Sequence, residues 1–179
     1  GTAVVAATTL GLSLGAVVAP AAAVEGSPSL VADIDAGAAP GVPRFLTTMG
    51  NATYFAAFDA NHRYGLWRTD GTPSGATLLK RFAGTRANDT GPRDLTVVDG
   101  TLFFTAATSE SGRELWKSDG TAAGTVQVAD IKPGQFSSGP AELTAYDGRV
   151  FFTASAADGA PDLWASDGTR SGTVLVKAF

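Results

Sequence analysis

The feature that most constrains this chain is a pattern, Trp-x-x-Asp-Gly-Thr, that occurs three times in one register. Its tryptophans are 49 and 48 residues apart, and the chain contains no other tryptophan. A fixed spacing of this length is typical of arrays in which each repeat is one supersecondary unit that stacks on its neighbours. The conserved positions within the chain are Trp67, Asp70, Gly71 and Thr72; Trp116, Asp119, Gly120 and Thr121; and Trp164, Asp167, Gly168 and Thr169.

Each unit contains four short apolar runs, which in the second unit cover residues 94–98, 101–106, 114–118 and 125–131. The runs are of strand length and rich in Val, Phe, Leu, Thr and Trp, and none has the length or period of a helix. Asp-Gly at 99–100 and 147–148 is the signature of a two-residue hairpin. We therefore predict an all-β chain of about three four-stranded antiparallel blades, near residues 42–82, 92–131 and 140–179.

Four strands in a repeat of about this length favour β-propeller-like blades over a stacked β array, which is the main alternative. Ile34, Phe82, Ile131 and Phe179 form a set with one more member than the tryptophans, so we expect one strand of a preceding unit. Because propellers usually need four or more blades, we expect an incomplete propeller. Such a chain would need further blades or a partner chain to close.

The Asp-Gly-Thr segment has two interpretations. In the first, the carboxylate accepts backbone N–H bonds in a turn and the glycine takes a left-handed conformation. In the second, the aspartate is a metal ligand, but one carboxylate per unit does not converge on one ion. Asp33 and Asp35 are a weak fragment of a calcium site. We favour the turn and expect neither a metal nor a cofactor.

Residues 1–23 are uncharged, rich in Ala, Val and Leu, and followed by small-residue sites typical of signal peptidase cleavage. We interpret this segment as a secretory signal peptide whose basic start is missing, and residues 24–179 as the β-repeat region. The alternative is a transmembrane anchor, which Gly, Thr, Ser and Pro disfavour. We thus expect a secreted, extracellular protein with no stable membrane span after removal of the signal.

Composition excludes several classes of function. There are 13 basic and 17 acidic residues, giving a net charge of −4, so no nucleic-acid partner is expected. The chain has no cysteine and one histidine, which excludes disulfides, thiolate chemistry and histidine-rich metal clusters. His62 has no evident acid partner, and a Ser-His-Asp triad is not supported.

The second unit reads Glu114-Leu115-Trp116-Lys-Ser-Asp119-Gly120-Thr121, and in this it resembles the ELWxxDGT-repeat family of bacterial secreted proteins. The first unit has Gly65 and the third Asp162 in place of the glutamate. The resemblance covers roughly residues 29–179. It implies extracellular, propeller-like repeats and no defined activity, so no catalytic residue is carried over.

The parts that do not repeat are the loops between the second and third runs and the connections between units. We expect both to lie at one end of the blades, where variable loops on a rigid scaffold bind ligands. The candidate ligand-facing residues are Asp59, His62, Arg63, Tyr64, Arg86, Asn88, Asp89, Glu110, Arg113 and Phe136.

We predict a non-catalytic extracellular binding or surface-interaction module for a glycan, peptide or protein. One alternative is a structural scaffold or spacer for further domains. Another is a fragment of a propeller-type carbohydrate-active enzyme, for which carboxylates clustered around the central channel would be diagnostic.

Overall fold

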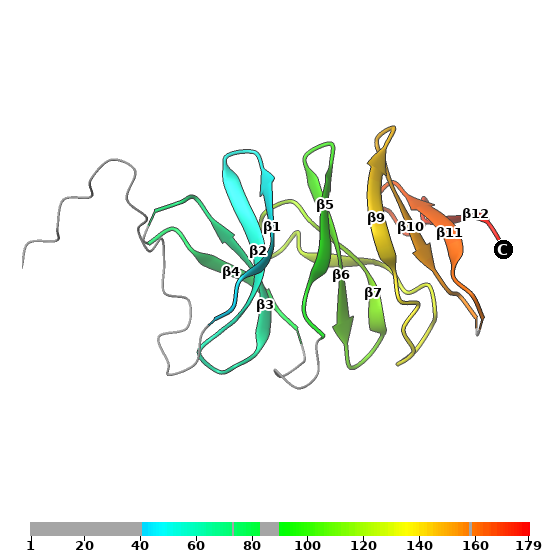
Figure 1. Ribbon diagram of the computed structural model, residues 1–179, viewed down its shortest axis with the longest axis horizontal. Helices are drawn as coiled ribbons and strands as arrows, with labels where there is room; N and C mark the ends of the chain where they lie inside the picture. Colours follow the sequence, from blue (N-terminus) through cyan, green and yellow to red (C-terminus); the bar gives the residue numbers. More distant parts are fainter. Residues whose placement is uncertain (1–40, 73, 83–89, 158) are drawn as a thin grey trace, which may run out of the picture.

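Three four-stranded antiparallel sheets follow one another along the chain in the computed structural model, which describes residues 41–72, 74–82, 90–157 and 159–179 (Figure 1). No residue in these ranges is helical, so none of them forms a helix that could span a membrane. The first sheet contains β1 (Arg44–Met49), β2 (Ala52–Phe58), β3 (Tyr64–Thr69) and β4 (Thr77–Arg81). The second contains β5 (Arg93–Val98), β6 (Thr101–Thr108), β7 (Gly112–Ser118) and β8 (Val126–Ala129). The third contains β9 (Ala141–Tyr146), β10 (Arg149–Ala154), β11 (Asp162–Ser166) and β12 (Val174–Lys177).

Within each sheet the strands are neighbours in chain order, so every unit is the predicted four-stranded meander. The strands of each sheet also fall within the three predicted blade ranges. The predicted signal segment 1–23, the Asp33 and Asp35 pair and the expected preceding strand near Ile34 lie outside the described residues. The prediction of an all-β fold with propeller-like blades is confirmed, and the three described sheets do not close into a ring.

The hairpins that join the first and second strands adopt the predicted turn chemistry. Asp99 and Gly100 both have positive φ, as do Asp147 and Gly148. Positive φ at both central residues defines the type I′ turn, whose twist matches that of the flanking strands. In the first unit only Gly50 has positive φ in the equivalent Gly50-Asn51 turn. The Asp-Gly pairs of the second and third units therefore specify a type I′ turn, and the Gly-Asn pair of the first unit gives a different turn.

The Asp-Gly-Thr segment is a turn, as we favoured. In the second unit, the backbone N–H and the hydroxyl of Thr121 both donate to Asp119 Oδ1, at 2.8 and 2.7 Å. The Thr121 hydroxyl oxygen accepts the Gly124 N–H at 2.9 Å. A Cβ atom on Gly124 would lie only 2.1 Å from Asp119 Oδ1, which explains the glycine that ends the motif. Asp70 and Asp167 accept the same pair of threonine bonds.

These threonine bonds change the acidity of the turn carboxylates. The hydroxyl bond and then the backbone bond from Thr121 lower the pKa of Asp119 below the usual value of an aspartate. The pKa values of Asp70 and Asp167 are lowered by the same two bonds. A lowered pKa means that the folded state favours the ionised form, so the stabilisation from these bonds is present at neutral pH and is lost as the pH falls through the lowered pKa.

Packing between sheets depends on the motif tryptophan. Trp116 lies in the core between the first and second sheets, where the Phe82 ring meets it edge-on at a centroid distance of 5.2 Å. Phe82 also meets Phe104 edge-on at 6.0 Å. Phe82 ends the first unit and the other two rings belong to the second, so these contacts join consecutive units. A corresponding core between the second and third sheets contains Phe103, Phe152 and the partly buried Trp164.

Each indole is held in place by a hydrogen bond within its own sheet. The Nε1–H groups of Trp67, Trp116 and Trp164 donate to the carbonyl oxygens of Ala57, Ala106 and Ala154 at 3.2, 3.1 and 3.1 Å. A buried indole N–H without an acceptor would cost free energy, so this bond allows the ring to be buried. Each unit thus contains both the tryptophan ring and the carbonyl oxygen that accepts its N–H.

The first strands of the sheets, β1, β5 and β9, come closest to one another (Figure 1). The Thr47 hydroxyl in β1 donates to the Leu95 carbonyl in β5 at 3.3 Å. In the same way, the Thr96 hydroxyl in β5 donates to the Leu143 carbonyl in β9 at 3.1 Å. Consecutive units are therefore joined by one repeated polar contact between their first strands, which we call the inner strands. The other strands of consecutive units are joined by an apolar core.

We predict that Trp116→Ala lowers the free energy of unfolding by about 3–5 kcal/mol, because it empties the centre of the core between the first two sheets. Chemical denaturation of the wild-type chain and the variant measures the change. Lys117→Ala, one residue away on the opposite side of β7, is the matched control and should change the stability by less than about 0.5 kcal/mol. Equal stability of Trp116→Ala and the wild type would contradict the packing role.

Candidate functional site

The loops between second and third strands and the connections between units lie at the same end of the molecule, as predicted. In every unit the end of the second strand bonds to the connection that precedes that unit. Phe58 N–H donates to Gly41 O at 2.8 Å, Ala107 N–H to Thr90 O at 2.9 Å, and Ser155 N–H to Ser138 O at 2.8 Å. These equivalent bonds fix the two classes of variable loop side by side.

Two residues that we expected to face a ligand are buried instead. The Tyr64 ring packs on Phe58 at a centroid distance of 3.9 Å, and a Cβ atom on Gly91 would lie within 2.8 Å of three Tyr64 side-chain atoms. Asp59 Oδ1 accepts the backbone N–H groups of Asn61 and Arg63. The prediction was wrong for Tyr64 and Asp59 because both complete the interior of the first unit.

Asp59 is also tied to the outermost strand of its sheet. The Arg81 guanidinium Nε of β4 lies 2.6 Å from Asp59 Oδ2, and that of Arg63 lies 3.8 Å away. Burial alone would raise the pKa of Asp59, but the hydrogen bonds from Arg81, Arg63 and Asn61 outweigh it and lower the pKa. Its carboxylate is ionised and fully engaged, which leaves it a structural role.

The remaining candidates divide between exposed positions and positions that the structure does not describe. His62, Arg63, Glu110 and Phe136 are exposed, and Arg113 is half-buried. Lys132 Nζ lies 5.6 Å from the centre of the Phe136 ring, a cation–π contact within the connection between the second and third units. Arg86, Asn88 and Asp89 lie outside the described residues.

A group of charged side chains, of which the sequence predicted only Arg113, lies where the first strands of the sheets meet the loops. Asp94 and Arg93 begin β5, Glu142 lies near the start of β9, and Arg113 comes from β7. Burial raises the pKa of Asp94, the positive charges of Arg113 and Arg93 oppose that rise, and the negative charge of Glu142 adds to it. The Glu142 carboxylate of the third unit is therefore close enough to affect the ionisation of Asp94 in the second unit.

The backbone at this cluster has an unusual conformation. Asp94 and Glu142 have φ values of 54° and 57°, and the equivalent residue of the first unit, Phe45, has 56°. Each lies where the pairing of the first two strands shifts register at a β-bulge. Left-handed non-glycine residues cost about 1–3 kcal/mol each and occur preferentially at functional sites. The bulge changes the direction of one side chain near the loops in each unit. This residue is Phe45 in the first unit, Asp94 in the second and Glu142 in the third.

Arg113 connects this cluster to the loops. Its Nη1 donates to the Gly91 carbonyl at 3.1 Å and to the Thr105 hydroxyl at 3.0 Å, and its backbone N–H donates to Ser137 Oγ at 2.8 Å. The guanidinium is thus held by the preceding connection and the backbone by the following one. Asp94, Arg113 and Glu142 form the candidate functional site, with Arg93 and Phe136 near its edge.

Glu114 holds the connection that borders this site. It is fully buried, and its carboxylate accepts the Ile131 N–H at 3.1 Å, the Ser138 N–H at 2.9 Å and the Ser138 hydroxyl at 2.6 Å. Burial raises the pKa of Glu114, and the bonds from Ser138 and from the backbone of Ile131 and Lys132 partly offset the rise. Glu114 is therefore a positioning residue for the loop that carries Phe136.

In the other units, different groups accept the backbone N–H at the position equivalent to Ile131. Asp162 Oδ1 accepts the Phe179 N–H at 3.0 Å, and in the first unit the backbone carbonyl of Tyr64 accepts the Phe82 N–H at 2.9 Å. Phe82, Ile131 and Phe179 are equivalent positions, so one repeated N–H has three different acceptors. In the first unit, which has Gly65 in place of the glutamate, this acceptor is the backbone carbonyl of Tyr64.

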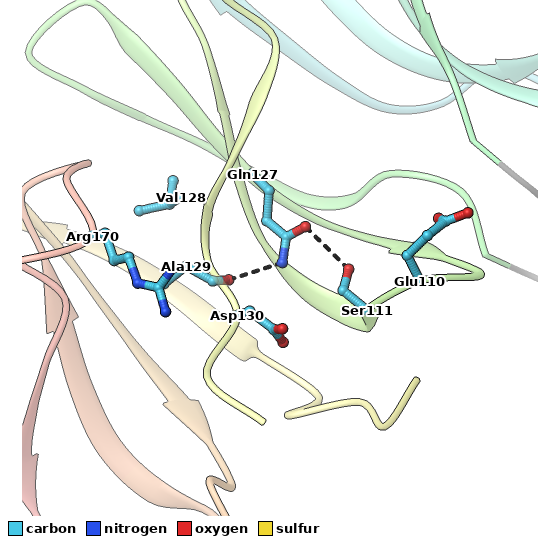
Figure 2. A pocket seen from close by; sticks show the side chains of 7 residues that line it. All are labelled: Glu110, Ser111, Gln127, Val128, Ala129, Asp130 and Arg170. Carbon is cyan, nitrogen blue, oxygen red and sulfur yellow. Dashed lines mark hydrogen bonds between the residues drawn. The ribbon is translucent and has the colours of Figure 1, made fainter. Parts of the chain in front are cut away.

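A shallow hollow of about 400 Å³ lies beside the outermost strand of the second sheet (Figure 2). Two of its polar side chains are hydrogen-bonded within the hollow: the Ser111 hydroxyl donates to Gln127 Oε1 at 3.0 Å, and Gln127 Nε2 donates to the Ala129 carbonyl at 3.2 Å. Among the described residues, Asp130 Oδ1 is buried without a hydrogen-bond partner. The lining residues are Glu110, Ser111, Gln127, Val128, Ala129, Asp130 and Arg170.

No three His, Asp or Glu side chains gather closely enough to hold a metal ion within the ranges that the structure describes. The motif aspartates are each engaged in a separate turn, at a separate place. The described residues therefore offer hydrogen-bonding and charged groups rather than a metal centre.

Comparisons with known proteins show a likeness to solved structures. No family model matches the chain. No curated protein matches it either. Among solved structures, an alpha-L-arabinofuranosidase from Clostridium thermocellum is similar, with 14% sequence identity and a TM-score of 0.37. The likeness covers 73% of this chain and 48% of the enzyme, which is about half its length. The fold assignment above rests on the strand order and register of the chain itself.

We predict that Glu114→Ala lowers the free energy of unfolding by at least about 2 kcal/mol, because three donors, two of them buried, lose their acceptor. A raised pKa also means that the folded state binds the proton more tightly than the unfolded state. Wild-type stability should therefore fall as the pH rises from the ordinary value of a glutamate through the raised one. The alanine variant should lack this slope.

Urea denaturation over a series of pH values measures both effects. Asp162→Ala is the matched control, because Asp162 holds the equivalent N–H in a more exposed place and should cost no more than about 1 kcal/mol. Identical pH profiles of the wild type and Glu114→Ala would contradict the role of Glu114.

Proposed function

We propose that this chain is an extracellular binding module of the ELWxxDGT-repeat type, and that it takes a polar or charged glycan or peptide at the loop-rich end. The proposal rests chiefly on the cluster of Asp94, Arg113 and Glu142. It combines donors and acceptors from two consecutive units on a backbone held in left-handed bulges. Arg113 bonds to Gly91 and Ser137 of the connections on either side of the second unit, so the cluster borders two variable loops on a repeated scaffold.

The chemistry of the cluster supports a polar ligand. Carboxylate and guanidinium groups make charge-assisted hydrogen bonds, which are stronger than bonds between neutral groups. Phe136, exposed on the neighbouring connection, adds a ring face of the kind that packs on sugars and side chains. The uncharged segment 1–23, with its small-residue cleavage sites, supports export of the protein.

A carbohydrate-active enzyme is the second candidate, and one observation favours it. Asp94 and Glu142 are two interacting carboxylates of adjacent units, and Asp94 has a raised pKa. Glycoside hydrolysis uses such a pair, one member protonated and one ionised. We place binding first because Arg113 and Arg93 set two cationic groups beside Asp94, which suits recognition of a charged ligand.

We predict that Asp94→Asn weakens binding of the best ligand from a glycan or peptide array by about tenfold or more, since one charge-assisted bond is lost. Asp99→Asn is the matched control, because Asp99 lies at the hairpin beyond the other end of β5 and should leave the affinity unchanged. Isothermal titration of both variants with that ligand gives the comparison.

Hydrolysis of arrayed glycosides by the wild type, abolished in Asp94→Asn and in Glu142→Gln, would replace the binding proposal by the enzymatic one. Equal affinity of Asp94→Asn, Asp99→Asn and the wild type would remove the cluster as the site. Absence of binding to every glycan and peptide would leave the scaffold alternative in its place.

A further inference from the structure

Five apolar positions recur on one face of each sheet, the face that looks toward the following unit. They come from the end of the first strand, the second strand, the third strand, the fourth strand and the end of the unit. In the first unit they are Met49, Tyr54, Leu66, Leu79 and Phe82; in the second, Val98, Phe103, Leu115, Val128 and Ile131; in the third, Tyr146, Phe151, Leu163, Val176 and Phe179.

These positions are covered in the first two units and open in the third. Met49 and Val98 are 9% and 6% exposed, whereas Tyr146 is 70% exposed. Phe82 is 2% exposed and its equivalent Phe179 is 84% exposed. The side chains are as apolar in the third unit as in the others. The third sheet thus has the same set of apolar residues on this face, and no further sheet among the described residues covers them.

The structure shows twice what covers this face. Over the first sheet lie Phe104, Ala106 and Trp116 of the second unit. Over the second sheet lie Phe152, Ala154 and the partly buried Trp164 of the third unit, at equivalent positions. A face of this type is therefore complementary to the Phe-Ala-Trp face of a unit of the same repeat.

A polar contact follows the same pattern. The hydroxyls of Thr47 and Thr96 each donate to a leucine carbonyl in the next unit. Their equivalent, Thr144, donates to the Glu142 carbonyl in its own strand, at 3.1 Å. The Thr47 and Thr96 hydroxyls also approach the carbonyl two residues earlier in their own strands. Only the bond to the next unit therefore distinguishes them from Thr144.

We propose that the open face of the third sheet is a docking surface for a further four-stranded unit of this repeat. The occupant presents its Phe-Ala-Trp face to Tyr146, Phe151 and Val176, and its inner-strand leucine carbonyl accepts the Thr144 hydroxyl. The first sheet of a second copy does not serve as this occupant, because its own Phe55 and Trp67 are already buried. This inference is independent of the ligand site at the loop-rich end.

The test extends the full chain by a copy of residues 132–179 joined directly after Phe179. Because Phe179 is equivalent to Ile131, the copy continues the repeat in register. We expect hydrogen exchange of the backbone amides of β10 and β11 to slow by at least tenfold in the extended chain. Unchanged exchange there would overturn the proposal, as would an extension that adds no strand content by circular dichroism.

Two substitutions of equal exposure show whether docking uses this face. Val176 and Leu175 are each 48% exposed, but only Val176 is equivalent to the residues that face the following unit. In the extended chain, Val176→Asp should abolish the slowing and Leu175→Asp should retain it. Equal effects of the two variants would overturn the assignment of the face.

The identity of the occupant is tested on the chain without the extension. Sedimentation velocity should show a monomer, because a second copy offers no uncovered Phe-Ala-Trp face. A dimer that Val176→Asp dissociates would overturn the proposed occupant in favour of two third sheets packed on each other. In the extended chain, alanine in place of the copied tryptophan should reverse most of the slowing.

Discussion

Each four-stranded sheet of this protein carries apolar side chains on both faces, and the rest of the structure follows from the need to cover them. Adjacent residues of a strand point to opposite faces, so Phe103 and Phe104 enter two different cores. A sheet of this kind that packs on one side only leaves its other apolar face exposed to water. Like units therefore stack on one another, and the motif tryptophan packs in the core between them, so that the apolar faces are covered.

The repeat separates what holds the units together from what can vary. The indole bonds and the aspartate–threonine bonds of the motif turns recur in all three units, and the threonine bond to the next unit recurs in the first two. The acceptor for the last N–H of each unit varies from a backbone carbonyl to an aspartate to a buried glutamate. That variation sets the course of each connection, and it gives the loop-rich end three different surfaces on one scaffold.

The sequence predicted what depends on neighbours along the chain. Asp99-Gly100 specifies its hairpin and Asp119-Gly120-Thr121 its turn, because these conformations are decided within a few residues. The repeat then placed the four strands of every unit correctly. Position in a loop, by contrast, did not predict exposure: Asp59 and Tyr64 are buried by contacts with Arg81 and Phe58.

The charged cluster could not be found in the same way. Asp94 and Glu142 are 48 residues apart in the sequence and meet only because consecutive inner strands lie side by side. One clue was present: both follow the connection between units at equivalent positions of the repeat. Aligning the units by their tryptophans and comparing the charged residues column by column would have paired them.

The central claim is that consecutive units are joined by the packing of the motif tryptophan on the last residue of the unit before it. A double-mutant cycle between Phe82→Leu and Trp116→Phe, followed by urea denaturation, measures that interaction directly. The edge-on contact of the two rings at 5.2 Å predicts a coupling free energy of about 0.5–1.5 kcal/mol. Additive effects of the two substitutions, with no coupling, would contradict the account.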